Sequence, residues 1–299
     1  MPDVAFVGLG KMGVGMAGRL LAAGCQVRVY NRTASRAESL VSRGARTCAT
    51  PAEACNGACA VFAMTADDQS SQSVWLGADG ILAANMAPDS LAVECSTLSH
   101  DWVMELAAQA NARGLKYIDA PVTGLPEAAA AGKLTLLVGA SEADLASVRA
   151  LLDALADRVL HFGPVGSGTA YKLMVNMMGA VQIAAAAEGM AIAERAGLDL
   201  AFVADAIATG QAASPQVVRN TRRMVDGDHD RNIVFTPALR LKDVEYALRF
   251  ARKLGVGSPF GELAACLLRQ LCELGHGQAN ESRIFEIARA QTAFAPPAK

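Results

Sequence analysis

A lysine and an asparagine one helical turn apart are the first candidates for chemistry in this 299-residue chain. Lys172 and Asn176 share one face of a helix, and they begin its most apolar helical segment. A lysine in such surroundings is costly unless it lies near water or a partner, and it can then donate or accept a proton at a lowered pKa. The alternative is a lysine that extends to solvent beside an ordinary polar helix residue.

Two further groups carry polar side chains where ligands could bind. The sequence DAPVTG (119–124) closes a predicted strand, and the carboxyl ends of such strands are where α/β proteins bind ligands. Thr123 offers a hydroxyl and Gly124 lets the backbone approach an anion, unless the segment is a plain strand-to-loop turn. Lys242 and Asp243, taken alone, indicate a charged pair on a solvated helix face.

The N-terminal segment predicts a dinucleotide site. A GxGxxG motif is formed by Gly8, Leu9, Gly10, Lys11, Met12 and Gly13. It follows a predicted strand and opens a predicted helix, so one glycine makes the tight turn, one lets the backbone approach a pyrophosphate and one lets helix and sheet pack closely. The helix N-terminus supplies N–H groups and a partial positive charge for the phosphates. A glycine-rich structural turn is the alternative.

The end of the next predicted strand favours NADP(H) over NAD(H). An NAD site usually has Asp or Glu here to bind the ribose 2′-hydroxyl, but this chain has neutral Asn31 followed by cationic Arg32. A guanidinium can bind a 2′-phosphate through two hydrogen bonds, whereas a carboxylate would repel it. Thr33 adds a hydroxyl, and Arg36 lies one helical turn further on. If Arg32 is an ordinary solvated charge instead, this preference does not follow.

Alternating strands and helices must position these residues. Near-continuous apolar strands that alternate with helices indicate a parallel sheet covered on both faces, so the first half is predicted to be α/β, a doubly wound Rossmann sheet. Thr50, Pro51 and Glu53 add a helix start, with capping-box spacing and a proline at the first helical position. The predicted strands are 4–7, 26–30, 60–64, 91–95, 117–120, 134–138 and 159–162, and the helices include 12–23, 35–42, 99–112 and 141–155.

Strand signals stop after residue 162. The predicted domains are an NADP-binding Rossmann domain, 1–163, and an all-helical C-terminal domain for substrate binding and oligomerisation, 164–299, joined by a long interdomain helix. The apolar stretch 173–187 is too short and too polar for a membrane span, and is predicted to be a helix buried on most sides. Alanine-rich helical faces predict a homodimer or homotetramer. The predicted helices are 168–196, 201–208, 215–224, 237–254, 259–274 and 282–291.

Composition argues against several classes of protein. The chain has 27 Lys and Arg against 29 Asp and Glu, a net charge of −2, so neither a basic nucleic-acid face nor a polybasic membrane attachment is predicted. Seven irregularly spaced cysteines, and an N-terminus that lacks a basic, apolar leader, favour reduced thiols in the cytoplasm. The four histidines are never paired at helical spacing, so no metal site is predicted.

Four ordered motifs resemble the β-hydroxyacid dehydrogenase family, which includes 3-hydroxyisobutyrate dehydrogenase, tartronate semialdehyde reductase and the glyoxylate/succinic semialdehyde reductases. The motifs span nearly the whole chain: VAFVGLGKMG, DAPVTG with the following GKLTLLVGA, GPVGSGTAYKLMVN, and KDVEYAL. Four motifs in order are far more specific than GxGxxG alone. The resemblance implies a Rossmann domain, a long interdomain helix, a helical domain and an active site in the cleft between the domains.

The resemblance also implies roles for single residues. Lys172 matches the family's catalytic lysine, and Asn176 matches the asparagine that helps hold the substrate. Thr123 and Gly124 match the loop that binds the substrate carboxylate. Residues 31–33 are similar to those of the NADP(H)-preferring reductases. Positions beside the cofactor are matched by Met64 and Thr65, by Ser96 and Thr97, and by Lys242.

The substrate loop departs from the family pattern. Many members have Ser-Gly-Gly where this chain has Thr123, Gly124 and Leu125, followed by Pro126 and Glu127. The leucine adds bulk and removes backbone freedom, and the glutamate adds negative charge near an expected anion site. This departure leaves open a substrate other than a simple four-carbon hydroxy acid.

Residues and resemblance together predict an NADP(H)-dependent oxidoreductase. It would interconvert a small 3-hydroxy acid and its semialdehyde, or reduce a small aldehyde or keto acid, with Lys172 as the acid and base. The carboxylate-bearing substrate is the expected partner, and reduction is the favoured direction. Two alternatives stay open, an NADPH-dependent imine reductase and a non-catalytic NADPH-binding interaction protein. A lysine at 172 counts against both, because relatives of those kinds usually have another residue there.

Overall fold

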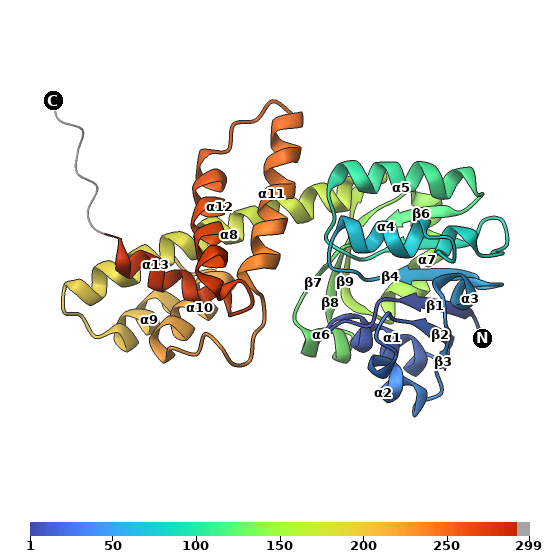
Figure 1. Cartoon of the computed structure of the whole chain (residues 1–299), viewed down its shortest axis with the longest axis horizontal. Helices are drawn as coiled ribbons and strands as arrows, with labels where there is room; N and C mark the ends of the chain where they lie inside the picture. Colours follow the sequence, from blue (N-terminus) through green and yellow to red (C-terminus); the bar gives the residue numbers. More distant parts are fainter. Residues whose placement is uncertain (292–299) are drawn as a thin grey trace. The chain divides into compact units, whose positions relative to one another are not determined.

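The computed structural model describes residues 1–291, which form two compact units divided between Leu173 and Met174. The first unit is an α/β sheet domain and the second is helical, as predicted (Figure 1). The division falls inside the long helix α8 (Ser167–Arg195), so this one helix carries both Lys172 and Asn176.

The sheet of the first unit has nine strands within the described residues, in the order β3-β2-β1-β4-β5-β6-β8-β7, with β9 paired to β8. β1 is parallel to β2 on one side and to β4 on the other, so the strand order reverses there. The strands are β1 (Asp3–Val7), β2 (Gln26–Tyr30), β3 (Arg46–Thr47), β4 (Ala60–Ala63), β5 (Leu91–Glu94), β6 (Lys116–Asp119), β7 (Val122–Thr123), β8 (Leu134–Gly139) and β9 (Ala156–Gly163).

The prediction of a wholly parallel sheet is wrong at one edge. β8 runs antiparallel to both β6 and β7, while β8 and β9 are parallel. The short segment between β6 and β8 is a two-residue strand and one short helix. It reverses the chain within the sheet, whereas a parallel return would need a crossover of a dozen or more residues.

Helices cover both faces of the sheet, as its apolar strands predict. Val4 and Phe6 of β1 join a core with α1, α2, α6 and α7. Ala5 and Val7, which point to the opposite face, join a core with α3, α4 and α5, and Figure 1 shows α4 and α5 on the other side of the sheet from α1 and α2. These helices are α1 (Gly13–Ala22), α2 (Glu38–Val41), α3 (Pro51–Cys55), α4 (Asp68–Leu76), α5 (His100–Ala112), α6 (Pro126–Ala131) and α7 (Glu142–Asp153), with 3₁₀ turns η1 (Ala34–Ala37) and η2 (Ile81–Ala83).

Several of these elements were not predicted. The helix predicted at 35–42 is a 3₁₀ turn followed by one α-helical turn, η1 and α2. Helix α4 has few apolar residues and therefore lacks a helical hydrophobic pattern. Its start is set by Asp67, whose side chain accepts a hydrogen bond from the Ser70 N–H in a capping box. β3, β7 and α6 are too short to give a periodic signal.

The second unit is helical throughout the described residues. Its core contains buried side chains from α8 and from the helices that follow it. The prediction that the stretch 173–187 of α8 is buried on most sides is wrong. Only 39% of the most apolar 18-residue stretch of α8 is buried, because one stripe packs in the core while Met174 and Met178 are exposed. Its length and composition would also suit a membrane span, a test that core helices pass as well. The later elements are α9 (Leu200–Thr209), α10 (Pro215–Asp226), α11 (Pro237–Lys253), α12 (Pro259–Leu271), a π-helical turn η3 (Cys272–His276), a 3₁₀ turn η4 (Glu281–Arg283) and α13 (Ile284–Ala290).

Candidate functional site

The glycine loop lies between β1 and α1 and has the geometry that a dinucleotide site needs. Gly8 has a φ of +97°, and a Cβ there would overlap the carbonyl oxygen of Met64. A Cβ at Gly13 would overlap the carbonyl oxygen of Gly8. At Gly10, by contrast, a Cβ would meet no atom within 4 Å. The first and third glycines are therefore required by the fold, and the second leaves open space beside the loop.

The start of α1 fits a phosphate. Its N-cap residue, Met12, makes no side-chain capping hydrogen bond, and the first turn contains no acidic residue. The N-terminal N–H groups of a helix without a side-chain cap favour an anion. The open space at Gly10 lies in the same loop, where the backbone approaches a bound pyrophosphate. This segment therefore fits the diphosphate of a dinucleotide.

The end of β2 is joined to this loop by an amide. Asn31 accepts a hydrogen bond at Oδ1 from the Leu9 N–H over 2.8 Å, and its Nδ2 donates to the Thr33 carbonyl over 2.9 Å. Arg32 and Arg36 are both exposed. A neutral amide thus stands where an NAD-specific site has a carboxylate, and the two arginines that follow it in the chain are exposed.

The loops after β4 and β5 are bonded to each other. The Thr65 N–H donates to Ser96 Oγ over 2.7 Å, and the two hydroxyls are 3.1 Å apart. Ser96 is buried and Thr97 is half-buried. The structure thus brings together two segments that the sequence analysis placed beside the cofactor. It adds Glu94, a buried carboxylate that the sequence analysis did not single out.

A buried carboxylate at the end of β6 caps helix α8. Asp119 accepts hydrogen bonds from the Gly166 N–H over 2.6 Å and from the N–H and hydroxyl of Thr169 over 2.7 and 2.9 Å. Burial raises the pKa of Asp119 from 3.8 to about 6, although these hydrogen bonds favour its ionised form. Because Lys172 lies one turn beyond Thr169, Asp119 fixes the start of the helix that carries the lysine.

Lys172 and Asn176 are both buried, with 8% of each exposed. Asn176 donates from Nδ2 to Oδ2 of Asp243 on α11 over 2.6 Å. Lys242 Nζ is 3.0 Å from Oδ1 of the same carboxylate. The interpretation of Lys242 and Asp243 as a solvated pair is therefore wrong, because Asp243 is only 2% exposed. The sequence could not show this, since the burial depends on how α11 packs against α8.

A buried ion pair supports this part of α8. Arg240 Nη1 donates to the Asn176 carbonyl over 3.3 Å, and its Nε donates to Glu281 over 2.7 Å. The guanidinium also lies 4.4 Å from the centre of the Phe235 ring. Arg240 and Glu281 are both almost fully buried. None of these three residues was predicted to support the site.

The substrate loop of the sequence analysis lies between β7 and α6. Thr123 ends β7 and is exposed, and Gly124 follows with a φ of +145°, which favours glycine. Leu125 is the N-cap of α6 and has no side-chain capping bond, while Pro126 occupies the first turn. The hydroxyl of Thr123 and the N-terminus of α6 are thus separated by only two residues of the chain.

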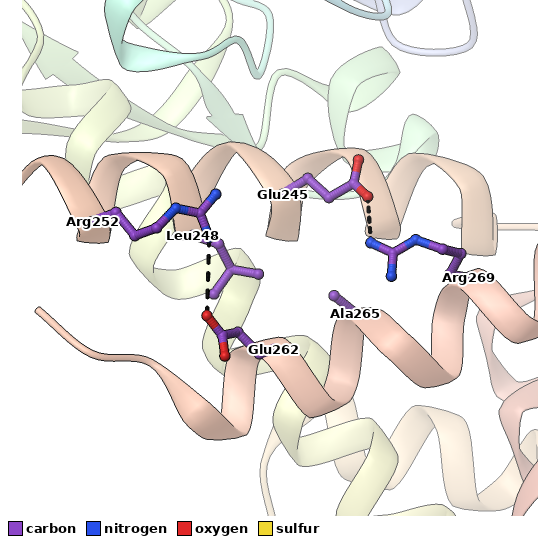
Figure 2. A pocket seen from close by; sticks show the side chains of 6 residues that line it. All are labelled: Glu245, Leu248, Arg252, Glu262, Ala265 and Arg269. Carbon is purple, nitrogen blue, oxygen red and sulfur yellow. Dashed lines mark hydrogen bonds and ion pairs between the residues drawn. The ribbon is translucent and has the colours of Figure 1, made fainter.

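One groove in the second unit lies away from the predicted residues. It lies between α11 and α12 and has a volume of about 390 Å³. The ion pairs Arg269–Glu245 (2.8 Å) and Arg252–Glu262 (3.9 Å) cross it, and Figure 2 shows Leu248 and Ala265 between the two pairs. None of the residues predicted from the sequence lines it. Among residues 1–291, no group of three or more His, Cys, Asp or Glu side chains could hold a metal ion.

Comparison with known proteins agrees with this geometry. Residues 3–163 match a family model described as the NAD binding domain of 6-phosphogluconate dehydrogenase, and residues 166–288 match one described as the NAD-binding of NADP-dependent 3-hydroxyisobutyrate dehydrogenase. An NAD-dependent L-serine dehydrogenase of Pseudomonas aeruginosa is 32% identical over 97% of this chain and 100% of its own length. The chain belongs to the β-hydroxyacid dehydrogenase family. It is an NAD(P)-dependent hydroxyacid dehydrogenase, as predicted.

Solved structures of β-hydroxyacid dehydrogenases share the whole fold. A 3-hydroxyisobutyrate dehydrogenase from Salmonella typhimurium has a TM-score of 0.87 at 28% identity, covering 96% of this chain and 100% of that one. A 3-hydroxyisobutyrate dehydrogenase from Mycobacterium tuberculosis, determined with L-serine, has a TM-score of 0.87 at 29% identity, covering 97% and 100%. The similarity therefore extends over both units.

Proposed function

We propose that this chain is an NADP(H)-dependent oxidoreductase that interconverts a small 3-hydroxy acid and its semialdehyde or reduces another small aldehyde or keto acid, with reduction as the favoured direction. The observation that carries the proposal is a buried lysine, Lys172, one helical turn before an asparagine whose amide is held by Asp243. The relatives support the substrate class. The substrates in their names, L-serine and 3-hydroxyisobutyrate, both have a carboxylate and a hydroxyl on the third carbon.

The residues of this chain would supply proton transfer and orientation, while the nicotinamide, when bound, carries the hydride. In reduction, the Lys172 ammonium donates a proton to the substrate oxygen and stabilises the negative charge that develops there. In oxidation, the neutral amine takes that proton back. Asn176 positions the same oxygen, and Thr123 with the Gly124 backbone holds the carboxylate, so the reacting atoms are aligned before the reaction.

The preference for NADP(H) rests on residues 31–33. Relatives named for NAD and for NADP both occur, so the residues of this chain carry the argument. The amide of Asn31 is already bonded to the glycine loop and is uncharged, which removes the repulsion that a carboxylate would exert on a 2′-phosphate. The exposed Arg32, with Arg36 beyond it, can bind that phosphate through two hydrogen bonds.

The test is an absorbance assay of NADPH oxidation with glyoxylate and with succinic, tartronate and methylmalonate semialdehydes. L-serine and 3-hydroxyisobutyrate are assayed with NADP⁺ in the other direction. We expect Lys172→Ala to lower kcat by about 10²–10⁴-fold, because proton transfer in the transition state contributes that much. The dissociation constant for NADPH should not change. Lys253→Ala, which removes an exposed lysine at the end of α11, is the matched control.

The outcome separates the proposal from its alternatives. Near-normal turnover by Lys172→Ala would contradict the role of the lysine. Turnover of a cyclic imine, with no turnover of any carbonyl acid, would favour an imine reductase. NADPH binding without turnover of any substrate would favour a binding protein.

We also propose that the enzyme is a cytoplasmic homodimer or homotetramer. Large apolar side chains of the second unit are exposed, with Ile192 at 69% and Phe202 and Phe260 at 74% each, which a partner subunit would cover. The seven cysteines form no disulfide, which suits a reducing compartment. A monomer mass in light scattering would contradict the oligomer, and a secreted product in cell fractionation would contradict the compartment.

A further inference from the structure

Glu94 is the last residue of β5, and its carboxylate is fully enclosed. Its side chain is 1% exposed and accepts three hydrogen bonds. Oε2 accepts from the Ser71 hydroxyl over 3.0 Å and from Trp75 Nε1 over 2.7 Å, both on α4. Oε1 accepts from the Ser96 N–H over 2.9 Å. Burying a carboxyl group is costly, and burial raises the pKa of Glu94 while its hydrogen bonds lower it.

Ser96 belongs to the β5 loop, residues 95–99, and it connects Glu94 to a second loop. Ser96 Oγ accepts the Thr65 N–H over 2.7 Å, so Glu94 also supports the β4 loop, residues 64–67. On the other side of the carboxylate, Trp102 Nε1 on α5 donates to Ser71 Oγ over 3.0 Å. Glu94 therefore joins two helices on one face of the sheet to two loops at the carboxyl ends of β4 and β5.

The strand order shows which part of the cofactor these loops face. In a sheet of this kind the dinucleotide lies across the carboxyl ends of the strands, at the point where the order reverses. Here that point is between β1 and β4, and the start of α1, which fits the diphosphate, follows β1 directly. The end of β2, with Asn31, faces the adenine half. The nicotinamide half must therefore extend the other way, over the loops after β4 and β5.

We propose that Glu94 is a positioning residue for the nicotinamide half of the cofactor. It fixes the Ser96 N–H, and through Ser96 it fixes the β4 loop, so that both loops have one arrangement before the cofactor binds. Because the Glu94 carboxylate is enclosed by its own donors, it acts through these loops and does not touch the reacting atoms. The inference rests on the proposed function, since it assigns a task to loops that the proposed reaction uses.

The hydrogen bonds make Glu94→Gln a sharp test. Glutamine keeps the shape of glutamate but replaces one acceptor oxygen with an NH₂ donor. Oε2 accepts from two donors and Oε1 from one, so we expect the glutamine oxygen to stay at Oε2 and the NH₂ group to face the Ser96 N–H. The Ser96 N–H then loses its acceptor, and a buried donor without an acceptor is costly. Ser71→Ala is the matched control, because it removes one bond to Glu94 and leaves the Ser96 bond intact.

The experiment measures two ligands on the cofactor-free protein by calorimetry. One is NADPH, and the other is adenosine 2′,5′-bisphosphate, which carries the adenine half alone. We expect Glu94→Gln to weaken NADPH binding about tenfold, the effect of one weakened hydrogen bond, and to leave binding of the bisphosphate unchanged. Hydrogen exchange at the Ser96 amide should also become faster in the cofactor-free variant. Ser71→Ala should change neither the ratio of the two dissociation constants nor this exchange rate.

An unchanged ratio in Glu94→Gln, or the same change of ratio in Ser71→Ala, would overturn the inference. If Glu94→Gln does not fold, Glu94→Asp replaces it; its shorter side chain keeps the charge but withdraws it from Ser96, and it should move the ratio in the same direction. Wild-type protein that reduces no substrate, together with the expected ratio, would contradict the proposed function and leave this inference standing. Turnover by the wild type, with an unchanged ratio of the two dissociation constants in Glu94→Gln, would support the proposed function and overturn this inference.

Discussion

The amide of Asn176 is oriented by Asp243, whose Oδ2 lies 2.6 Å from Nδ2 of the asparagine. A carboxylate has no hydrogen to donate, so the NH₂ group of Asn176 must face Asp243 and the amide oxygen faces away from it. Both side chains are buried, so water does not compete for this hydrogen bond and the amide keeps one orientation. Under the proposed function, this oxygen would accept from the hydroxyl of the 3-hydroxy acid, and the second N–H of the NH₂ group would donate to the carbonyl of the semialdehyde.

We expect Asp243→Ala to disturb this orientation and to destabilise the second unit. It removes the acceptor for Asn176 and the carboxylate 3.0 Å from Lys242 Nζ, and losing a buried partner costs about 1–3 kcal/mol. In the steady-state assay, kcat should fall about tenfold or more. Urea unfolding measures the stability. The control is Glu245→Ala. Glu245 lies on α11 like Asp243, and the substitution breaks its half-exposed ion pair with Arg269 of α12, so kcat and the free energy of unfolding should both change little. Equal effects of the two substitutions would contradict the argument.

The fold of the glycine loop was predictable from the local sequence. A glycine loop between a strand and a helix is a short-range pattern, so the tight turn at Gly8 and the close packing at Gly13 follow from their spacing. Asp243 was different, because a charged pair on a helix has the same sequence pattern whether it is exposed or buried. Glu94 was missed because a carboxylate that ends an apolar strand gives no periodic signal. Its importance depends on donors from α4, which are 19 and 23 residues earlier in the chain.

The two glycines Gly8 and Gly10 should respond differently to alanine. A Cβ at Gly10 meets no atom within 4 Å, so Gly10→Ala should keep the melting temperature. It should weaken NADPH binding, because the methyl group occupies the space through which the backbone approaches the diphosphate. Gly8→Ala forces a φ of +97° on alanine and an overlap with Met64, so it should lower stability by about 1–2 kcal/mol or more. Thermal unfolding and calorimetry distinguish the two effects. Loss of stability in Gly10→Ala, with normal binding, would refute this assignment.

The choice between NADPH and NADH should depend on Arg32. Replacing Arg32 with Asp puts a carboxylate beside neutral Asn31, where it repels a 2′-phosphate and can bind a 2′-hydroxyl. A hydrogen bond to a charged group contributes about 1.5–3 kcal/mol, so Arg32→Asp should weaken NADPH binding about 10–100-fold and leave NADH binding equal or tighter. Arg46→Asp, a substitution of an exposed arginine on β3, controls for the change in net charge. An unchanged ratio of the two dissociation constants in Arg32→Asp would show that its guanidinium is only a solvated charge.

The stability of the first unit should depend on pH through Asp119. Burial raises the pKa of Asp119 to about 6 in the folded protein, above the value of 3.8 that applies when it is exposed. When the pKa of a group is higher in the folded than in the unfolded protein, its contribution to stability is fully present below the pKa of the unfolded state. This contribution is lost as the pH rises through the pKa of the folded state. The whole change, from about pH 4 to above pH 6, corresponds to about 3 kcal/mol.

Urea unfolding of wild type and Asp119→Asn at pH 5 and pH 7.5 isolates this contribution. Asparagine cannot titrate, and it can offer only one oxygen to the three donors on Gly166 and Thr169, so the variant should be less stable at both pH values. Its disadvantage should be greater at pH 5, by about 1 kcal/mol, because only the wild type gains from protonating Asp119 there. Other titrating groups affect both proteins alike and cancel in the difference. If the difference in unfolding free energy is the same at both pH values, the hydrogen bonds at the start of α8 outweigh the burial of Asp119, and its folded pKa is not raised.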